Sequence, residues 1–400
     1  MQQRTTASTI QTEDLFQIPT YKKMPMALER GEGRYVWDQE GRRYLDFYGG
    51  HCVTILGHCP PRVVSAVSEQ AGTLMFYSNV AYSPVRAEAA QALATLAPEG
   101  MGHLFFCNSG TEANETALKL ARTSTGKAGV LGMEGGFHGR TLGSLATTWA
   151  NKYRAPFRSV LPDTVFAPFG DLEAAAAAME RHGDIAAVIL EPIQSMAGIQ
   201  TAEASYFEGL RQLCDQHGAC LIFDEVQTGV GRTGTFSIAD TLGVKPDLIT
   251  MAKSLGSGMP VGAVFVSDAI AEKVGYGDQG TTFGGGMLAM AAVKAVADTI
   301  VNDALMDRAP VIFERVKQGI EQLPGVVAVR GQGCLIGVEL DGPAAPVLAA
   351  LRDHGVIAGG AVPPNVIRLM PPLNTTDEEI DEFVTAFRSS VEGIKMKDEG

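Results

Sequence analysis

The sequence predicts a two-domain α/β protein. We expect a large domain with a mostly parallel, seven-stranded sheet sandwiched by helices, and a smaller α+β domain built from both chain ends. The chain has 400 residues, which exceed one small core and suit two lobes around a shared cleft. Between about residues 60 and 290, short apolar runs alternate with helical stretches, a pattern typical of βαβ units. Hydrophobic residues make up 46% and charged residues 19%, which permits a large buried core and excludes wholesale disorder.

The chain ends carry the smaller domain, expected at residues 21–59 and 291–400. Residues 1–20 are polar and indicate a loose N-terminal arm. Two extended pieces at 33–38 and 43–47, with Gly41 in the turn between them, predict a β-hairpin. Near the other end, the pattern predicts strands at 327–330, 335–339 and 366–369 and a closing helix at 377–391.

The large domain is expected at residues 60–290. Its strands are predicted at 104–107, 129–133, 164–167, 186–190, 219–223, 248–251 and 262–266. Its helices are predicted at 61–74, 85–96, 112–121, 172–181 and 206–217. In such sheets a ligand lies beyond the carboxyl ends of the strands, so the residues that follow each strand are the first candidates for a site.

Composition and charge exclude several classes of function. The net charge of −13 argues against nucleic acid as the main partner, because phosphate-binding surfaces need clustered Lys and Arg. No uninterrupted apolar stretch of about 18 residues occurs, so no membrane span is expected. The N-terminus lacks the basic start and apolar run of a signal peptide. The six cysteines form no Cys-x-x-Cys pair, which favours reduced thiols in a cytoplasmic protein without a metal site.

Polar residues follow the first predicted strand of the sheet. Gly110 permits a tight turn, and Ser109 and Glu112 have the spacing of a capping box. A helix N-terminus with free N–H groups and the hydroxyls of Ser109 and Thr111 is a natural phosphate seat. The alternative is an ordinary capped helix that binds no ligand.

Charged residues follow three further strands: Glu191, Asp224 and Lys253. An acid at the end of a hydrophobic strand is costly to bury without a cationic partner. The alternative for each acid is an N-cap or a structural ion pair. Partial burial would lower the pKa of Lys253 and make it a better nucleophile, whereas the alternative is a lysine at the sheet rim.

A phosphate seat, a carboxylate and a buried lysine are together the protein groups that pyridoxal 5'-phosphate (PLP) needs. The carboxylate pairs with the protonated pyridine nitrogen, and the lysine forms a Schiff base and later moves the proton. The sequence therefore predicts PLP as cofactor, with Lys253 and Asp224 as the catalytic residues.

Seven motifs in order then carry a family resemblance. They are Asn108-Ser109-Gly110-Thr111-Glu112-Ala113-Asn114, Gly136-Phe137-His138-Gly139-Arg140-Thr141, Glu191-Pro192-Ile193-Gln194, Asp224-Glu225-Val226-Gln227-Thr228-Gly229, Ala252-Lys253-Ser254-Leu255-Gly256, Thr281-Thr282-Phe283-Gly284-Gly285 and Asn365-Val366-Ile367-Arg368-Leu369. From about Tyr21 to the last helix, the chain resembles the class III, or subgroup II, aminotransferases of PLP fold type I. Within that family it looks most like the acetylornithine and succinylornithine aminotransferases.

The resemblance implies a role for each residue around the cofactor. Lys253 is the Schiff-base lysine and proton shuttle, and Asp224 holds the pyridine nitrogen. The other direct contacts are Ser109, Gly110 and Thr111 to the phosphate, Val226 and Phe137 to the two ring faces, and Gln227 to the phenolic oxygen. Glu191 orients Gln227 and the ring, and His138 is a hydrogen-bonding support.

The resemblance also implies contacts to substrates and to a second subunit. Arg140 would bind the α-carboxylate of an ornithine-type donor, and Arg368 the carboxylate next to the keto group of 2-oxoglutarate. The alternative for either arginine is a salt bridge within the protein. Tyr21 and His51 fall at positions that line the family's pocket. Thr282 is expected to reach the phosphate of the other subunit, which implies a homodimer with shared sites.

One position departs from the family pattern. Many relatives carry a glutamate that masks the arginine equivalent to Arg368, and Met196 stands at that position here. Methionine cannot neutralise an arginine. Either Arg368 stays exposed and favours donors with a carboxylate next to the amine, or another acid such as Glu32 serves. We hypothesise that Met196 loosens discrimination between α- and ω-amino donors.

The predicted activity is ping-pong transfer of the ω-amino group of an N-acetylornithine-type donor to 2-oxoglutarate. Another donor, such as GABA, a β-amino acid or a lysine-type amine, is one alternative, and a PLP amino mutase or epimerase is a second. A catalytically silent PLP-fold binding protein is a third. Lys253, Asp224 and the phosphate segment are all present, which argues against the silent protein.

Overall fold

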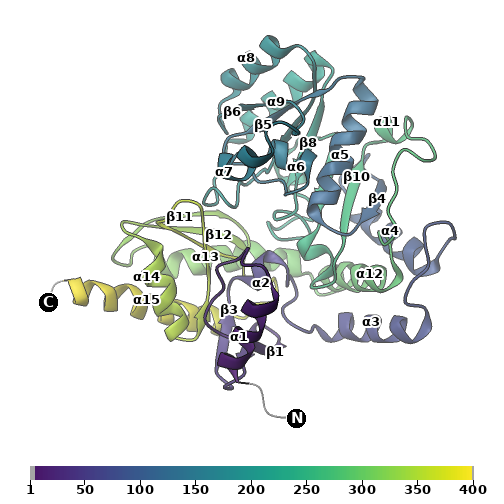
Figure 1. Cartoon of the computed structure of the whole chain (residues 1–400). Helices are drawn as coiled ribbons and strands as arrows, with labels where there is room; N and C mark the ends of the chain where they lie inside the picture. The colour runs from purple at the N-terminus through teal and green to yellow at the C-terminus, as the bar shows by residue number, and fades with distance from the viewer. Residues whose placement is uncertain (1–4, 399–400) are drawn as a thin grey trace.

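The computed structural model describes residues 5–398, which form two lobes (Figure 1). One lobe holds a seven-stranded sheet and the other holds two four-stranded sheets. Within residues 5–398, no helix is long and apolar enough to cross a lipid bilayer.

The seven-stranded sheet confirms the predicted fold class. Its strands lie in the order β4 (His103–Cys107), β10 (Gly262–Val266), β9 (Leu248–Met251), β8 (Cys220–Asp224), β7 (Ile185–Leu190), β5 (Gly129–Met133) and β6 (Thr164–Ala167). β10 runs antiparallel to both of its neighbours, β4 and β9. The other five strands, β9, β8, β7, β5 and β6, are parallel to one another. Four strands have the predicted bounds, and the bounds of the other three differ by one residue, because short apolar runs mark the strands of this sheet.

Helices cover both faces of this sheet. On one face α5 (Gly110–Thr125) packs Ala117 and Leu118 in a cluster with Ile189 of β7. On the other face α8 (Leu172–His182) and α9 (Ala204–His217) join a cluster with Val188. Successive residues of β7 therefore enter opposite cores, as a fully buried strand requires.

The smaller sheets join the two ends of the chain. One has the order β1 (Leu28–Glu32), β2 (Tyr35–Asp38), β3 (Arg43–Asp46) and β13 (Val356–Ile357), and the other β11 (Val326–Gln332), β12 (Leu335–Leu340), β15 (Val366–Leu369) and β14 (Gly359–Gly360). The predicted hairpin is β2–β3. Because β13 pairs in parallel with β3, the N-terminal strands and the C-terminal segment share one sheet.

Helices connect and cover the lobes. The long ones are α3 (Pro61–Thr73), α4 (Pro84–Leu96), α12 (Met287–Asn302), α13 (Arg308–Ile320), α14 (Ala344–Asp353) and α15 (Asp377–Asp398). The short ones are α2 (Gly49–Cys52), α6 (Leu142–Thr147), α7 (Asn151–Arg154), α10 (Ile238–Leu242) and α11 (Asp268–Ala271), with 3-10 segments η1 (Ala155–Phe157), η2 (Lys253–Gly256) and η3 (Leu305–Asp307). The domain boundary expected at residue 290 falls inside α12, which packs on α3 and α4.

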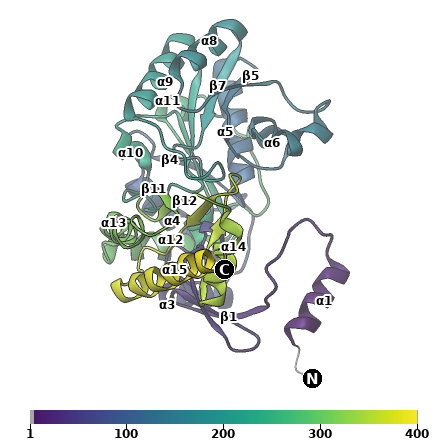
Figure 2. The ribbon, with the colours of Figure 1, turned by 90° about the vertical axis from the view of Figure 1, so that its left-hand side faces the viewer.

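The N-terminal arm corrects one expectation. Residues 1–20 were expected to be loose, yet α1 (Thr6–Phe16) forms within them and stands to one side of the lobes (Figure 2). Thr5 and Ser8 make a reciprocal capping box, and the Thr6 hydroxyl bonds Glu40. No residue of α1 is buried, so capping stabilises this helix and no apolar stripe reveals it. Residues 1–4 lie outside the described chain.

Candidate active site

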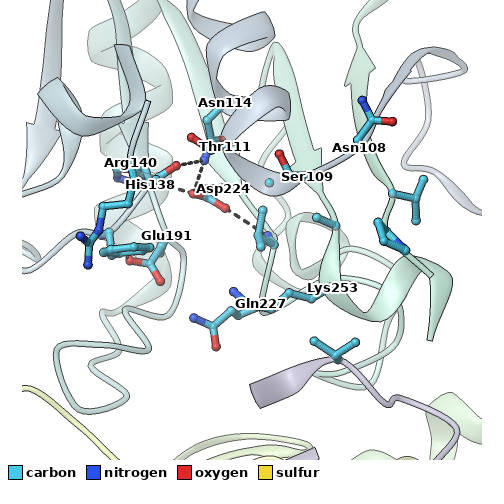
Figure 3. A pocket seen from close by; sticks show the side chains of 18 of the residues that line it. Asn108, Ser109, Thr111, Asn114, His138, Arg140, Glu191, Asp224, Gln227 and Lys253 are labelled. Atoms are coloured by element: carbon cyan, nitrogen blue, oxygen red, sulfur yellow. Dashed lines mark hydrogen bonds and ion pairs between the residues drawn. The ribbon is translucent and has the colours of Figure 1, made fainter. Parts of the chain in front are cut away.

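A cavity of about 410 Å³ opens beyond the carboxyl ends of β4, β7, β8 and β9, where the sheet topology predicts a ligand (Figure 3). Predicted residues gather in its wall: Ser109, Gly110, Thr111, Phe137, His138, Arg140, Glu191, Asp224, Val226, Gln227 and Lys253. They come from segments spread between residues 109 and 253, and parallel strands bring them to one edge of the sheet.

The N-terminus of α5 forms one wall of the cavity. Ser109 caps the helix and accepts a hydrogen bond from the Glu112 N–H at 3.3 Å. The Glu112 carboxylate accepts from the Asn108 N–H at 2.8 Å, one residue before the position of a standard capping box. A Cβ on Gly110 would lie 2.9 Å from Cγ2 of Val226, so only glycine lets the helix start this close to β8. The unpaired N–H groups of a first helical turn suit an anion.

Asp224 is almost fully buried at the end of β8 and is held by three donors. Its Oδ2 bonds Nδ1 of His138 at 2.7 Å and the Asn114 amide at 2.8 Å, and its Oδ1 accepts from the Val226 N–H at 3.1 Å (Figure 3). The Asn114 amide is itself oriented, because its oxygen accepts from the Thr250 hydroxyl at 2.7 Å. This network keeps a carboxylate in one position in the cavity wall.

Lys253 begins the 3-10 segment η2, immediately after β9. Its φ is 30°, in the left-handed region that non-glycine residues rarely adopt, which marks local backbone strain at the site. Loss of water around its amine lowers the pKa of Lys253, although the charges of Asp224 and Glu191 oppose this shift. A lowered pKa increases the neutral fraction of an amine, which is the nucleophilic form.

Glu191 is buried in the cavity wall, immediately after β7. Its carboxylate accepts from the Phe137 N–H at 2.9 Å and the Ser195 N–H at 3.3 Å. Burial, and then the charge of Asp224, raise the pKa of Glu191. Glu191 therefore fixes the backbone of the segment that carries Phe137.

Two arginines make no ion pair within residues 5–398. Arg140 is exposed at the cavity, with its guanidinium carbon 3.6 Å from the ring centroid of Tyr153 and 5.7 Å from that of Phe137. Arg368 on β15 is buried, yet it donates only to neutral oxygens, namely Gly360 O at 2.7 Å, Ser195 Oγ at 3.0 Å and the Tyr48 hydroxyl at 3.3 Å. Burial lowers the pKa of Arg368.

Besides Arg368, four predicted residues lie outside the cavity wall. Tyr21 is 82% exposed, and Thr282 is also exposed. His51 bonds the Tyr48 hydroxyl through Nδ1, and the backbone carbonyl of Met196 accepts from the Val362 N–H at 2.9 Å. For these four, the proposed contacts to substrate or cofactor remain predictions.

The sequence analysis missed several residues that support the site. Asn114 lies one helical turn after Gly110, on the same face of α5, so its spacing could have revealed it. Ser195, Thr250 and Glu115 carry no such local signal, because their partners lie far along the chain.

Comparison with known proteins decides the family. A family model described as "Aminotransferase class-III" matches residues 16–391. The chain belongs to the class III aminotransferases. This aminotransferase is thus a PLP-dependent transaminase, as its family membership and the site indicate.

The similar proteins of known function include several acetylornithine aminotransferases. The aminotransferase is 42% identical over 383 residues to the acetylornithine aminotransferase of Methanopyrus kandleri, covering 94% of this chain and 98% of that relative. It is 40% identical to the acetylornithine aminotransferase of Bacillus subtilis, covering 94% and 97%.

Solved structures agree on the fold. The ornithine aminotransferase of Toxoplasma gondii superposes with a TM-score of 0.93 at 27% identity, covering all of this aminotransferase and 97% of that chain. The acetylornithine aminotransferase of Elizabethkingia anophelis gives a TM-score of 0.85 at 29% identity, covering 98% and 100%. These likenesses confirm the predicted two-lobed α/β fold.

The residues present fit PLP. The start of α5 offers unpaired N–H groups where a Cβ on Gly110 would collide with Val226, and Asp224 is a carboxylate fixed in the same cavity. Lys253 supplies an amine with a lowered pKa, and Phe137 supplies an aromatic ring in the wall. These groups match the phosphate, the ring nitrogen, the aldehyde and the ring face of the cofactor.

Proposed function

We propose that this protein transfers the ω-amino group of N-acetylornithine to 2-oxoglutarate. The observation that carries the proposal is a pair of arginines, Arg140 at the cavity and Arg368 behind it, that have no carboxylate partner in the described part of the chain. Each substrate has a carboxylate for one of them. The names of the relatives at 38–42% identity support this donor.

The donor is proposed to bind Arg140 through its α-carboxylate. Tyr153 and Phe137 lie against the guanidinium and restrict its position, so a carboxylate that binds Arg140 is held at a defined place relative to Lys253. An acylated α-nitrogen carries no charge, which leaves the distant ω-amine as the reactive group of such a donor.

Lys253 and Asp224 are proposed to perform the proton chemistry. When bound, PLP supplies an electron sink that stabilises negative charge at the carbon bearing the amine. Nζ of Lys253 takes the proton from that carbon and later returns a proton, as a general base and acid. Asp224, held by His138, Asn114 and the Val226 N–H, keeps the ring nitrogen protonated.

The second half-reaction is proposed to use the same residues with a different carboxylate site. 2-Oxoglutarate binds Arg368 through the carboxylate next to its keto group, and Lys253 moves the proton in the opposite direction. Glu191 and Gln227 hold the ring during both halves.

Two further proposals concern the molecule as a whole. We propose a homodimer in which Thr282 reaches the phosphate in the site of the partner subunit. The cytoplasmic location remains a prediction from cysteine usage, and all six cysteines are unpaired here.

The proposed function is tested by half-reactions of the PLP form. We expect N-acetylornithine to convert the cofactor to its amino form, followed by absorbance, in the absence of any acceptor. Arg140→Gln should slow conversion by N-acetylornithine by about tenfold to a hundredfold, the effect of losing a charge-assisted contact, and leave conversion by glutamate unchanged. Arg158→Gln is the matched control, because Arg158 is an exposed arginine outside this cavity that bonds Asn151.

Other outcomes would redirect the assignment. Conversion by glutamate but not by N-acetylornithine would overturn the donor, and GABA, β-alanine and lysine would then be tested. Conversion of Arg140→Gln by N-acetylornithine at the rate of the unmodified enzyme would remove Arg140 from the donor site.

A further inference from the structure

A buried chain of hydrogen bonds joins Arg368 to the cofactor cavity. Nη1 of Arg368 donates to Oγ of Ser195 at 3.0 Å, and Oγ of Ser195 donates to Oε1 of Gln227 at 2.9 Å. Their exposed fractions are 2%, 0% and 6%. The three residues come from β15, the loop after β7 and the segment after β8, so the chain crosses from the small lobe into the large one.

The chemistry of Arg368 sets the direction of the first hydrogen bond, and the placement of the Gln227 amide sets that of the second. A guanidinium has donors and no acceptor, so the Ser195 oxygen must accept from Arg368. Ser195 then has one proton to give, and the remaining partner is the amide oxygen of Gln227. Donation in the structure therefore runs from Arg368 to Ser195 to Gln227, and the positive charge strengthens both bonds.

The Gln227 amide is oriented with its oxygen toward Ser195. Its oxygen is engaged by Ser195, and within residues 5–398 its nitrogen has no hydrogen-bond partner. Gln227 lines the cavity, and in Figure 3 it points into the same part of the pocket as Lys253. The amide nitrogen is thus available as a donor to a ligand there, whereas the reversed amide would turn an acceptor toward it.

Arg368 has an unusual set of partners for a buried cation. A buried charge normally pairs with a carboxylate, whereas Ser195, Gly360 and Tyr48 all contribute neutral oxygens. Neutralisation is left to a substrate carboxylate. When that carboxylate binds, it must compete with or reorient the contact between Arg368 and Ser195. A change at Ser195 then reaches Gln227, because the Ser195 hydroxyl bonds the Gln227 amide.

We propose that Ser195 is a positioning residue that couples carboxylate binding at Arg368 to the orientation of Gln227 in the cofactor cavity. The inference rests on the proposed function, because it takes Arg368 as the acceptor site. A serine with a purely structural role would need no such pair of partners, since Glu191 already holds the Ser195 backbone N–H.

The test uses the PLP-loaded enzyme and glutarate, a dicarboxylate that has no keto group and cannot react. Calorimetry gives its Kd, and the absorbance spectrum of the bound cofactor gives the response of the ring. In the unmodified enzyme we expect glutarate to bind and to shift the spectrum. Ser195→Ala should abolish the spectral shift while glutarate still binds, because the hydrogen-bond link from Arg368 to Gln227 is lost.

Two further variants make the result specific. Ser390→Ala is the matched control, because Ser390 is equally buried and bonds only the Ala386 carbonyl of its own helix. Gln227→Ala should abolish the spectral shift while glutarate still binds, and it provides the test if Ser195→Ala fails to fold. Ser195→Thr, which keeps the hydroxyl, should retain the shift.

The outcomes separate this inference from the proposed function. If Ser195→Ala binds glutarate with the same Kd and the same spectral shift as the unmodified enzyme, the coupling does not exist. If the unmodified enzyme does not bind glutarate, the acceptor role of Arg368 is wrong and the inference falls with it. Neither result depends on which amine is the donor.

Discussion

Three buried acids lie at the ends of β7 and β8, and a different set of hydrogen-bond donors compensates the burial of each carboxylate. Asp224 bonds a histidine, an amide and a backbone N–H, and Glu191 accepts from two backbone N–H groups. Glu225 points away from the cavity, where it accepts from Ser237, Thr228 and the Ile238 N–H. Two consecutive residues, the last of β8 and the one after it, thus separate a cofactor-facing carboxylate from a structural one.

Glu225 gives the fold a predictable dependence on pH. Burial raises its pKa to about 7, despite the hydrogen bonds that lower it. The folded state therefore holds this proton more tightly than the unfolded state. Its contribution to stability is fully present below the unfolded pKa and is lost as the pH rises to about 7.

We expect Glu225→Gln to reduce this loss. Between about pH 5 and about pH 8, the unfolding free energy of the unmodified protein should fall by on the order of 1–3 kcal/mol more than that of the variant. Chemical denaturation at the two pH values measures the difference. Glu173→Gln, at an exposed position on α8, should behave like the unmodified protein. Equal slopes in all three proteins would show that Glu225 does not titrate between folded and unfolded states.

At the scale of elements, α5 organises more than the phosphate seat. Glu115 lies one turn after Thr111 and accepts from the N–H groups of Gly143 and Ser144 at 2.8 and 3.1 Å, and from the Thr141 hydroxyl. A carboxylate at the start of α6 satisfies donors that a short helix cannot pair itself. The segment that carries Arg140 is thereby anchored to α5.

Glu115→Ala should loosen this anchor. We expect KM for the amino donor to rise by about tenfold, as for loss of hydrogen bonds to a charged group, with KM for the acceptor unchanged because Arg368 lies on β15. Steady-state kinetics with each substrate varied in turn measures both values, and Glu173→Ala is the control. A parallel rise in both KM values would indicate a general disturbance of the site.

At the scale of the whole molecule, two segments of the large lobe carry exposed aromatic residues, one at residues 76–82 and the other at residues 282–284. Phe76, Tyr82 and Phe283 are exposed, and the rings of Phe76 and Phe283 lie 5.0 Å apart between centroids. The Asn79 amide bonds the Gly284 carbonyl at 2.9 Å and joins the segments. Adjacent exposed aromatic residues are typical of a protein interface, and Thr282 lies within this surface.

We expect two defective chains to complement each other in a mixed dimer. A Lys253→Ala homodimer should be inactive, and a Thr282→Ala homodimer should bind PLP more weakly. In the mixed dimer, the Thr282→Ala chain retains its own Lys253 and receives Thr282 from its partner, which restores one complete site. The enzyme activity after subunit exchange, measured at limiting PLP, shows whether one complete site is restored.

The controls for the mixed dimer are the two homodimers and the unmodified protein, with mass determined by light scattering. Activity of the mixture equal to the average of the separate homodimers would place Thr282 in its own chain's site. A monomeric mass would contradict the dimer itself.

Several features could be determined from the sequence by itself. The strands of the large sheet are uninterrupted apolar runs, and the polar residues that follow them, such as Asp224 and Lys253, lie at the cavity because parallel strands end at one edge. The turn at Gly110 and the helix cap at Ser109 could be predicted from the local sequence, because each depends only on neighbouring residues. The weak apolar pattern of residues 6–16 hid α1, which depends on a cap.

Only the tertiary structure decided how these residues are held. His138 and Asn114 meet Asp224 from 86 and 110 residues away, and Ser195 meets Arg368 from 173 residues away. It also decided that Arg368 is buried with no carboxylate partner among residues 5–398, and that β13 joins β3. Hydrogen-bond direction and partner depend on positions in space, and sequence periodicity reports only which face of an element is buried.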